Sequence, residues 1–385
     1  MSAKVRWGIL STAWINVAML GPLRRSSRSE LMAVASRSQE KAQDYATKND
    51  IAKAYGSYEQ LLNDPEIDVI YNSLPNTLHA EWTIQAAAAG KHVMCEKPLV
   101  TTLDDLDAVE SAAHEHRVTV FEAISFLHHP QLQTIRQWVS AGHLGKLELI
   151  VCWDAFCLPP EDRDNIRLNP QLAGGALWDV GVYPNDFAIA LIDAGPPVEV
   201  WAQQTTGPTG VDLTPIGQLR FSNNVVAQIS CGMRSPGRRG AHVIGTKGML
   251  VVQDHLSGAE WPGDPPQPGR LTYVDTQGNQ NNIQIPAVDA YEAEVKAMEA
   301  CVLDGAEPVV SLEHSRTFVG YGAGSFAIAS QQFGDVPGWT VIQTPHNEYL
   351  MVMVEFGIVG LLSLLLLFAV QWMASFRLGE MKHFA

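Results

Sequence analysis

Three titratable side chains in this sequence, Lys97, Asp179 and Tyr183, are of types that can hold or exchange protons. Lys97 and Pro98 come shortly after Lys91–Cys95 (KHVMC), which is predicted to be a strand. Asp179 and Tyr183 are four residues apart in GGALWDVGVYP (174–184), so on a helix they share one face. A solvated loop lysine and a core tyrosine are the ordinary structural alternatives. Together, however, an ammonium, a carboxylate and a phenol suit acid–base chemistry.

A turn of small residues after the first apolar run is a candidate phosphate site. A strand followed by a tight turn and a helix N-terminus presents free N–H groups and a positive dipole to an anion. The glycine-rich dinucleotide fingerprint is degraded here, but the residues at positions 11 and 13 remain small where the backbone must approach a pyrophosphate. The predicted cofactor-binding residues in this turn are Ser11, Thr12, Ala13, Trp14 and Ile15.

The end of the second predicted strand indicates which nicotinamide cofactor is bound. A site for NAD would place an acidic residue there, to bond the ribose 2′-hydroxyl. This sequence instead has Ser36 and Arg37, with Lys41 one turn on. Arg37 can pair with a 2′-phosphate and stack on adenine. The pattern therefore favours NADP over NAD, unless Arg37 is only a solvated loop residue.

Two further strand ends contribute candidate cofactor contacts. The third strand is followed by Leu74, Pro75 and Asn76, with His79 in the next helix. The fourth is followed by Glu96, Lys97 and Pro98. Because the loops after parallel strands meet at one edge of the sheet, these residues are expected to line one crevice.

Strands alternating with helices predict a doubly wound Rossmann domain over residues 1–121. Strands are expected at 5–10, 31–36, 67–73, 91–95 and 118–123, with helices at 15–24, 39–48, 77–89 and 103–116.

From about residue 150 the residue pattern changes to β-rich runs separated by Gly, Pro and Asn. This predicts an α+β domain over residues 122–335 with a large, mostly antiparallel open sheet. Its strands are expected at 147–154, 198–205, 217–221, 225–231, 242–245 and 249–253. Helices at 131–141, 180–193, 290–303 and 312–332 are expected to cover one face of that sheet.

Six blocks over about 300 residues carry a resemblance to the Gfo/Idh/MocA oxidoreductase family. They are EKP (96–98), EA…HHP (122–130), AGHLGKLELI (141–150), NIRLNPQLAGGALWDVGVYP (165–184), GTKG (245–248) and AYEAEV (290–295). The sequence is most similar to the branch that contains glucose–fructose oxidoreductase, D-xylose dehydrogenase and the dimeric dihydrodiol dehydrogenases. The resemblance implies an NAD(P)-dependent enzyme that moves a hydride between nicotinamide and a secondary alcohol of a sugar, polyol or dihydrodiol.

The resemblance also implies roles for individual residues. Lys97 matches the lysine that contacts the nicotinamide ribose and the reacting oxygen, and the Lys97–Pro98 bond is expected to be cis. Tyr183 matches the acid/base and Asp179 the acid that contacts substrate or orients the base, while Arg167 is a candidate contact to substrate hydroxyls. Leu127 stands where the family commonly has an arginine, so the substrate cannot be transferred from a relative.

The implied mechanism needs Tyr183 to exchange a proton with the substrate oxygen. A phenol with an ordinary pKa of about 10 is a poor base at neutral pH. A neighbouring Lys97 ammonium would favour the phenolate, which predicts a lowered pKa for Tyr183.

Bulk composition excludes several classes of protein. The net charge of −15 argues against non-specific nucleic-acid binding. Five scattered cysteines without CxxC spacing predict free thiols in a reducing compartment, hence a cytoplasmic enzyme body. Adjacent His128 and His129 lack the spacing of a metal site, and none is expected.

Residues 336–385 form a tail unlike the enzyme. Gly357–Ala374 is 18 residues long without a charge, which predicts a single hydrophobic helix able to span a membrane. Arg377 and Lys382 follow it, and the positive-inside rule would then put the enzyme outside, although it has no export signal. The run Thr344–Leu367 resembles the end of the O-antigen ligase/polymerase family. This suggests a fused fragment, through which the enzyme would associate with a membrane.

Two alternatives to a soluble dehydrogenase remain. The fold could serve as a non-catalytic sugar or nucleotide sensor, or the chain could be a fragment of a membrane glycan-assembly protein. For the enzyme, the resemblance implies a dimer or tetramer formed through the outer face of the second-domain sheet.

Overall fold

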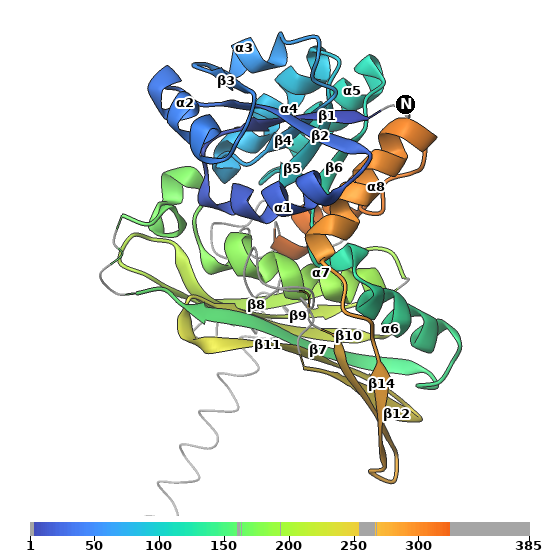
Figure 1. Ribbon diagram of the computed structural model, residues 1–385. Helices are drawn as coiled ribbons and strands as arrows, with labels where there is room; N and C mark the ends of the chain where they lie inside the picture. Colours follow the sequence, from blue (N-terminus) through green and yellow to red (C-terminus); the bar gives the residue numbers. More distant parts are fainter. Residues whose placement is uncertain are drawn as a thin grey trace, which may run out of the picture. The chain divides into compact units, whose positions relative to one another are not determined.

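The computed structural model describes residues 4–159, 162, 164–192, 194–253, 266 and 268–323. In this part of the chain a parallel sheet of six strands is followed by a mixed sheet of eight (Figure 1). The predicted tail helix over 357–374 lies outside the described residues. Within them, none of the helices combines the length and apolar character that a membrane span requires.

The first sheet has the strand order β3-β2-β1-β4-β5-β6, and its described strand pairs are parallel. Because the order reverses between β1 and β4, the loops after these strands flank a crevice at the carboxyl edge. The Rossmann prediction is confirmed. Its strands are β1 (Val5–Leu10), β2 (Ser29–Ala35), β3 (Lys53–Tyr55), β4 (Val69–Asn72), β5 (His92–Glu96) and β6 (Val120–Ala123).

Helices cover both faces of this sheet, and polar caps fix where several of them begin. Ser38 caps α2 by accepting from Lys41 N, and Thr102 caps α5 by accepting from Asp105 N. The short β3 and α3 were not predicted. The helices of this part are α1 (Val17–Arg25), α2 (Gln39–Lys48), α3 (Tyr58–Leu62), α4 (His79–Ala88) and α5 (Leu103–His116).

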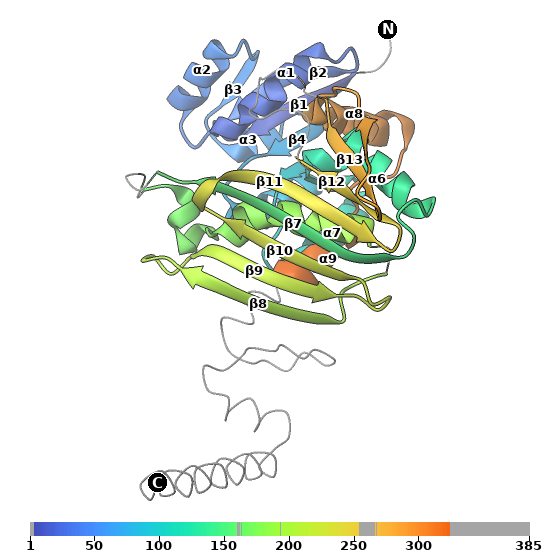
Figure 2. The same ribbon diagram turned by 90° about the horizontal axis from the view of Figure 1, so that it is seen from below.

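The second sheet has the order β14-β13-β12-β11-β7-β10-β9-β8 and is antiparallel except for the parallel pair β7 and β10. The mostly antiparallel prediction is confirmed, and Figure 2 shows the sheet spread in front of α6 and α7. Its strands are β7 (Leu147–Cys157), β8 (Glu199–Thr206), β9 (Asp212–Arg220), β10 (Val226–Gly232), β11 (Arg234–Gly245), β12 (Gly248–Val252), β13 (Arg270–Asp275) and β14 (Gln280–Gln284). The pair β13 and β14 was not predicted.

Two helices, α6 (Pro130–Ser140) and α7 (Val182–Leu191), cover one face of this sheet, as expected. Ile135 of α6 and Phe187 of α7 are buried in the same core as Ile150 and Ile229 of the sheet. The helix predicted over 312–332 is described as α9 (Leu312–Thr317) followed by a π-helical turn, η7 (Phe318–Ala323). The rest of that prediction lies outside the described residues.

The prediction that residues 290–303 cover the second sheet is wrong. Helix α8 (Ala290–Asp304) packs beside α1 on the Rossmann domain, where Val295 and Met298 are buried against Trp7 and Met19 (Figure 1). Its apolar stripe identifies a buried face but not which core receives that face.

Polar contacts hold α8 in that place. Arg25 of α1 pairs with Asp289 at 2.5 Å and with Glu292 at 3.0 Å. Arg28 pairs with Asp304 at 2.8 Å near the other end of the helix. These contacts fix both ends of α8, so its first turn has a defined position beside the carboxyl edge of the parallel sheet.

Candidate functional site

A cavity of about 1570 Å³ lies at the carboxyl edge of the parallel sheet and extends to the second sheet. Sixteen of the seventeen site residues predicted from the sequence line it, and only Pro98 does not. The residues of the first turn, the β2 end and the β4 end lie on the Rossmann side. Arg167, Asp179 and Tyr183 come from the second domain. The structure therefore brings together the residues that the sequence singled out.

The turn after β1 has the backbone that a phosphate site requires. Ser11 has φ of +100°, its amide donates to Ala35 O at 3.0 Å, and its hydroxyl accepts from Ala13 N at 3.1 Å. Ser73, after β4, bonds Ser11 from the side. The turn is thus held open across the switch point of the sheet, ahead of the N-terminus of α1. A dinucleotide fits this arrangement of turn, helix N-terminus and long cavity.

The exposed guanidinium of Arg37 reaches the cavity from the end of β2, where Ser36 and Lys41 also line it. Arg37 lowers the pKa of Tyr58 by proximity, although burial keeps that pKa above its ordinary value. No acidic residue lines the cavity at this strand end among the described residues. The local charge is therefore positive at the place where the 2′ substituent of an adenine ribose would bind.

His79 is buried, and both of its ring nitrogens face backbone carbonyls. Nδ1 lies 2.7 Å from Pro98 O, and Nε2 lies 2.6 Å from Leu74 O. The ring therefore ties the loop after β4 to the loop after β5, and its direct contact with a cofactor stays a prediction. The Lys97–Pro98 bond is cis, as the resemblance implied.

Asn76 joins the two domains across the cavity. Its Nδ2 donates to Ala173 O at 3.0 Å. Ala173 precedes Gly174 and Gly175, and a Cβ at Gly175 would lie 2.1 Å from Asp212 Oδ1 in a backbone with φ of +123°. Asp212 in turn accepts from Leu177 N at 2.7 Å. The glycine pair thus allows the close approach that places the following π-helical turn η6 (Leu177–Gly181) beside the cavity.

Asp179 lies on that turn between two cations. Lys97 Nζ donates to Asp179 O at 2.5 Å and lies 3.3 Å from Asp179 Oδ1. Arg167 Nε donates to Asp179 Oδ2 at 2.6 Å, and its guanidinium stacks over Phe156. Burial would raise the pKa of Asp179, but Lys97 and Arg167 outweigh burial and lower it. The carboxylate stays charged and fixes the lysine in place.

The Lys97 ammonium stands 5.1 Å from the centroid of the Tyr183 ring. Burial would lower the pKa of Lys97, but Tyr183, Asp179 and Glu96 outweigh it, so the pKa is raised. The lysine is therefore a permanent positive charge beside the phenol. Glu96, next to it in sequence, accepts a hydrogen bond from the Tyr71 hydroxyl.

The prediction of a lowered pKa for Tyr183 is wrong. Burial raises that pKa above its ordinary value, and although Lys97 acts to lower it as expected, Glu96, Asp179 and Asp154 add to the rise. The sequence shows the lysine but not the desolvation or the surrounding carboxylates. Tyr183 is consequently protonated at neutral pH, and in that form it can donate a proton.

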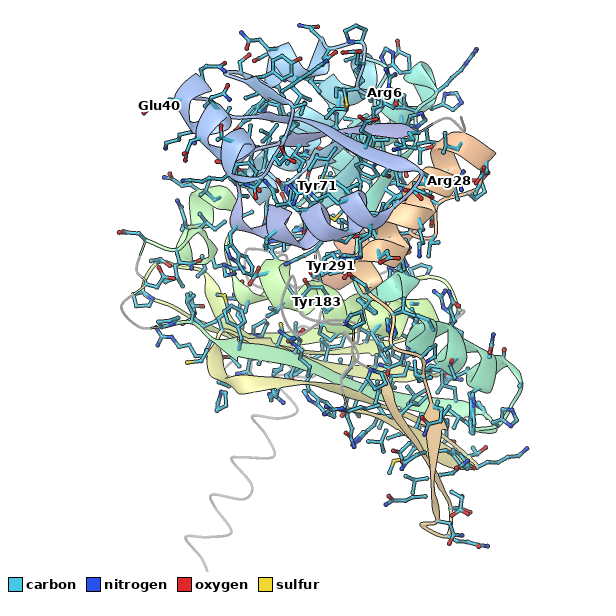
Figure 3. All side chains as sticks on the ribbon, in the orientation of Figure 1. Arg6, Arg28, Glu40, Tyr71, Tyr183 and Tyr291 are labelled. Atoms are coloured by element: carbon cyan, nitrogen blue, oxygen red, sulfur yellow. The ribbon has the colours of Figure 1, made fainter. Side chains whose placement is uncertain are left out.

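Several cavity residues were not singled out from the sequence. Tyr291, at the first turn of α8, lies beside Tyr183 between the two sheets (Figure 3), and its pKa is raised by burial and by Tyr183. The block AYEAEV contained this tyrosine, but only the unexpected packing of α8 brings it to the cavity. Ser125, Asp154, Arg239 and Gln253 are among the other unpredicted residues of the lining.

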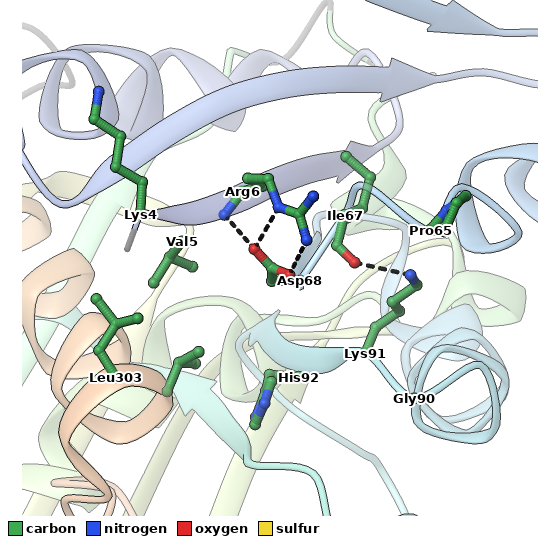
Figure 4. Close-up of a pocket in the computed structure, with 11 residues that line it drawn as sticks. Lys4, Val5, Arg6, Pro65, Ile67, Asp68, Gly90, Lys91, His92 and Leu303 are labelled. Atoms are coloured by element: carbon green, nitrogen blue, oxygen red, sulfur yellow. Dashed lines mark hydrogen bonds and ion pairs between the residues drawn. The ribbon is translucent and has the colours of Figure 1, made fainter. Parts of the chain in front are cut away.

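A smaller cavity of about 570 Å³ lies at the opposite, amino edge of the parallel sheet (Figure 4). Three of its charged groups contact the protein itself. Arg6 Nη2 pairs with Asp68 Oδ1 at 2.7 Å, and Lys91 Nζ donates to Asp64 O and Ile67 O. These contacts brace the strand ends, so we regard this hollow as structural.

Comparisons with known proteins agree with the geometry. Two family profiles match, "Oxidoreductase family, NAD-binding Rossmann fold" over residues 5–124 and "GFO/IDH/MocA C-terminal domain" over residues 132–251. The chain is 35% identical over 310 residues to D-xylose 1-dehydrogenase (NADP(+)) 2 of Haloferax volcanii, covering 80% of this chain and 92% of that protein. It is 30% identical to trans-1,2-dihydrobenzene-1,2-diol dehydrogenase of Danio rerio, covering 81% and 92%.

A solved structure shares the fold. The 3-ketoreductase KijD10 from Actinomadura kijaniata, in complex with NADP and TDP-benzene, superposes with a TM-score of 0.74 at 26% identity, covering 82% of this chain and 94% of that one. The chain belongs to the GFO/IDH/MocA family of NAD(P)-dependent oxidoreductases, enzymes that act on CH–OH groups.

Proposed function

We propose that this protein uses NADP to transfer a hydride between nicotinamide and a secondary alcohol or ketone of a sugar, polyol or dihydrodiol. The observation that carries the proposal is the convergence of Lys97, Asp179 and Tyr183 in a cavity whose far end is lined by Arg37 and the turn at 11–15. The relatives named above are a D-xylose 1-dehydrogenase, a trans-1,2-dihydrobenzene-1,2-diol dehydrogenase and a 3-ketoreductase.

The protein's own groups supply binding, charge and a proton. When bound, the cofactor supplies the hydride chemistry. In the reducing direction Tyr183 donates its proton to the substrate oxygen as negative charge develops there. Lys97 stabilises that charge, while Asp179 holds Lys97 in place and Arg167 is proposed to contact a neighbouring hydroxyl. In the oxidising direction Tyr183 accepts the proton instead.

The experiment that tests the proposal measures cofactor binding and turnover on the full chain. NADPH and NADH are titrated by their fluorescence, and a panel of aldoses, polyols, dihydrodiols and keto sugars is then assayed. Because Arg37 can form a charge-assisted bond with the 2′-phosphate, we expect NADPH to bind at least about tenfold more tightly than NADH. Binding without turnover across the panel would favour a sensor, and no binding of either nucleotide would contradict the cofactor site.

We also propose that the outer face of the second sheet joins copies of this chain. On this face the Trp153 ring packs edge-on against the His242 ring, with 5.3 Å between the ring centroids. Trp153 and Ile216 both pair with Ser230 of β10, and Ile216 is 39% exposed. Ile216→Asp is expected to shift a dimer or tetramer toward monomer in sedimentation velocity. Val309→Asp, at an exposed apolar residue off the sheet, is the control. An oligomer that survives Ile216→Asp unchanged would place the contact elsewhere.

The proposed catalytic unit ends at about residue 335. The family profiles end at residue 251, and the cavity residues are drawn from positions 11–291. Deletion of residues 336–385 is expected to leave kcat and KM unchanged and to remove any association with lipid vesicles, since it removes the uncharged run at 357–374. A loss of activity in the shortened, folded protein would show that the tail belongs to the enzyme.

A further inference from the structure

Three consecutive residues of α9 contact three different elements. His314 Nε2 lies 2.8 Å from Asp186 Oδ1 on α7. Ser315 Oγ donates to Glu122 Oε2 on β6 at 2.6 Å. Arg316 Nη2 donates at 2.6 Å to both Asp107 and Glu110 of α5. This short helix therefore bridges the Rossmann domain and the helix that carries Tyr183.

Both ends of this bridge lead to the candidate catalytic residues. On the Rossmann side, Glu122 Oε1 accepts from Leu99 N at 3.0 Å, two residues beyond Lys97. On the other side, Asp186 lies on α7 three residues after Tyr183, within one helical turn. The chain of contacts thus runs from the lysine loop, through α9, to the tyrosine helix.

The linking groups are buried and charged, so their arrangement is costly to maintain. Glu122 is 1% exposed, and Asp186 and Ser315 are fully buried. Burying two carboxylates and an imidazole stabilises a fold less than apolar side chains of similar size would. Such groups instead fix the relative positions of the elements that they join, because each hydrogen bond sets both a distance and an angle.

We propose that Glu122, Ser315, His314 and Asp186 form a positioning network that fixes Lys97 relative to Tyr183. The inference rests on the proposed function, since it gives a role to the distance between these two residues. Lys97 and Tyr183 belong to different domains, and their 5.1 Å separation would change with any shift of one domain against the other. The network restrains that shift from behind the cavity, without touching cofactor or substrate.

The ionisation of Glu122 should make the effect of this network depend on pH. Burial and the nearby Asp186 carboxylate raise the pKa of Glu122 to about 7, while Ser315, Leu99 N and His314 act to lower it. His314 keeps a raised pKa through Asp186 and Glu122, although burial and Arg136 oppose this. Because Glu122 binds its proton more tightly in the folded state than in the unfolded state, the free energy of unfolding falls as pH rises from about 4.5 to 7. Glu122→Gln removes that loss.

The test uses the full chain and four variants. Glu122→Ala and His314→Ala break the network, Glu122→Gln keeps its hydrogen bonds without charge, and Glu313→Gln makes the same change on the exposed side of α9. We expect His314→Ala and Glu122→Ala to lower kcat at least about tenfold, with the Kd for NADPH unchanged. Glu313→Gln should match the wild type, and Glu122→Gln should match it at pH 6.

The pH profile separates positioning from mere structural support. Ionised Glu122 faces Asp186, so we expect the ratio of kcat of Glu122→Gln to that of the wild type to rise as pH passes 7. The Tm of Glu122→Gln should likewise exceed that of the wild type at pH 8 and match it near pH 5. A constant kcat ratio from pH 6 to 8, or a folded His314→Ala with wild-type kcat, would overturn the network. An inactive wild type would instead count against the proposed function.

Discussion

Tyr183→Phe is expected to reduce kcat by about 10²- to 10⁴-fold in either direction, because it removes the proposed proton donor and acceptor. Phenylalanine fills the same space and keeps the edge-on contact with Phe126, so the fold and the Kd for NADPH should not change. Steady-state kinetics and NADPH fluorescence measure the two effects separately. Tyr273→Phe removes a hydroxyl that donates to Lys247 O, at a residue that does not line the cavity, and serves as the matched control.

The raised pKa of Tyr183 gives this prediction a sign in pH. In the reducing direction the phenol must be protonated, so the rate should be level through neutral pH and fall only in alkali. In the oxidising direction the phenolate is required, so the rate should rise with pH across the same range. Tyr183→Phe should lose both dependences. A variant that retains wild-type kcat would remove Tyr183 from the mechanism.

Lys97→Met is expected to lower kcat/KM by about 10²- to 10³-fold, because it removes the fixed positive charge beside the reacting oxygen. Methionine keeps most of the apolar stem but leaves Asp179 with Arg167 as its remaining cation. Lys97→Arg keeps the positive charge but changes the shape of the group that carries it. If the charge decides the rate, Lys97→Met should lose more kcat/KM than Lys97→Arg; if the geometry decides it, Lys97→Met should not lose more.

Exposed Lys146→Met is the control for Lys97→Met, and it should leave the kinetics unchanged. Circular dichroism and Tm establish that each variant folds. The pH profile gives a second readout: without Lys97 the pKa of Tyr183 should rise further, which moves the alkaline fall of the reductive rate to higher pH. Unchanged kcat/KM for Lys97→Met would exclude the lysine from catalysis.

The Rossmann domain could be predicted from sequence because its rules are local. Buried strands and helices alternate at short intervals, and the crossover rule then assigns one edge to the ligand. Thirteen of the sixteen predicted cavity residues belong to this domain and meet there for this reason. The second sheet was harder. Gln280–Gln284 (QNNIQ) is polar and mostly exposed at the sheet edge, so it carries no apolar alternation to indicate β14.

What the sequence could not supply was tertiary context. The amphipathic pattern of α8 shows an apolar face, but only the structure shows that this face meets Trp7 and Met19, and with it that Tyr291 reaches the cavity. The direction of the Tyr183 pKa shift was missed for a related reason. A neighbouring lysine is visible in sequence, whereas desolvation depends on what surrounds the phenol after folding.

The return of α8 to the Rossmann domain has a consequence for synthesis on the ribosome. Val5 and Val295 share one core although 290 positions separate them, so the nucleotide domain cannot complete its apolar face until nearly all of the described chain has emerged. Contacts at such separation form slowly and leave hydrophobic surface uncovered in the meantime. A nascent chain arrested before residue 290 should therefore bind holdase chaperones, and release should follow once α8 has emerged.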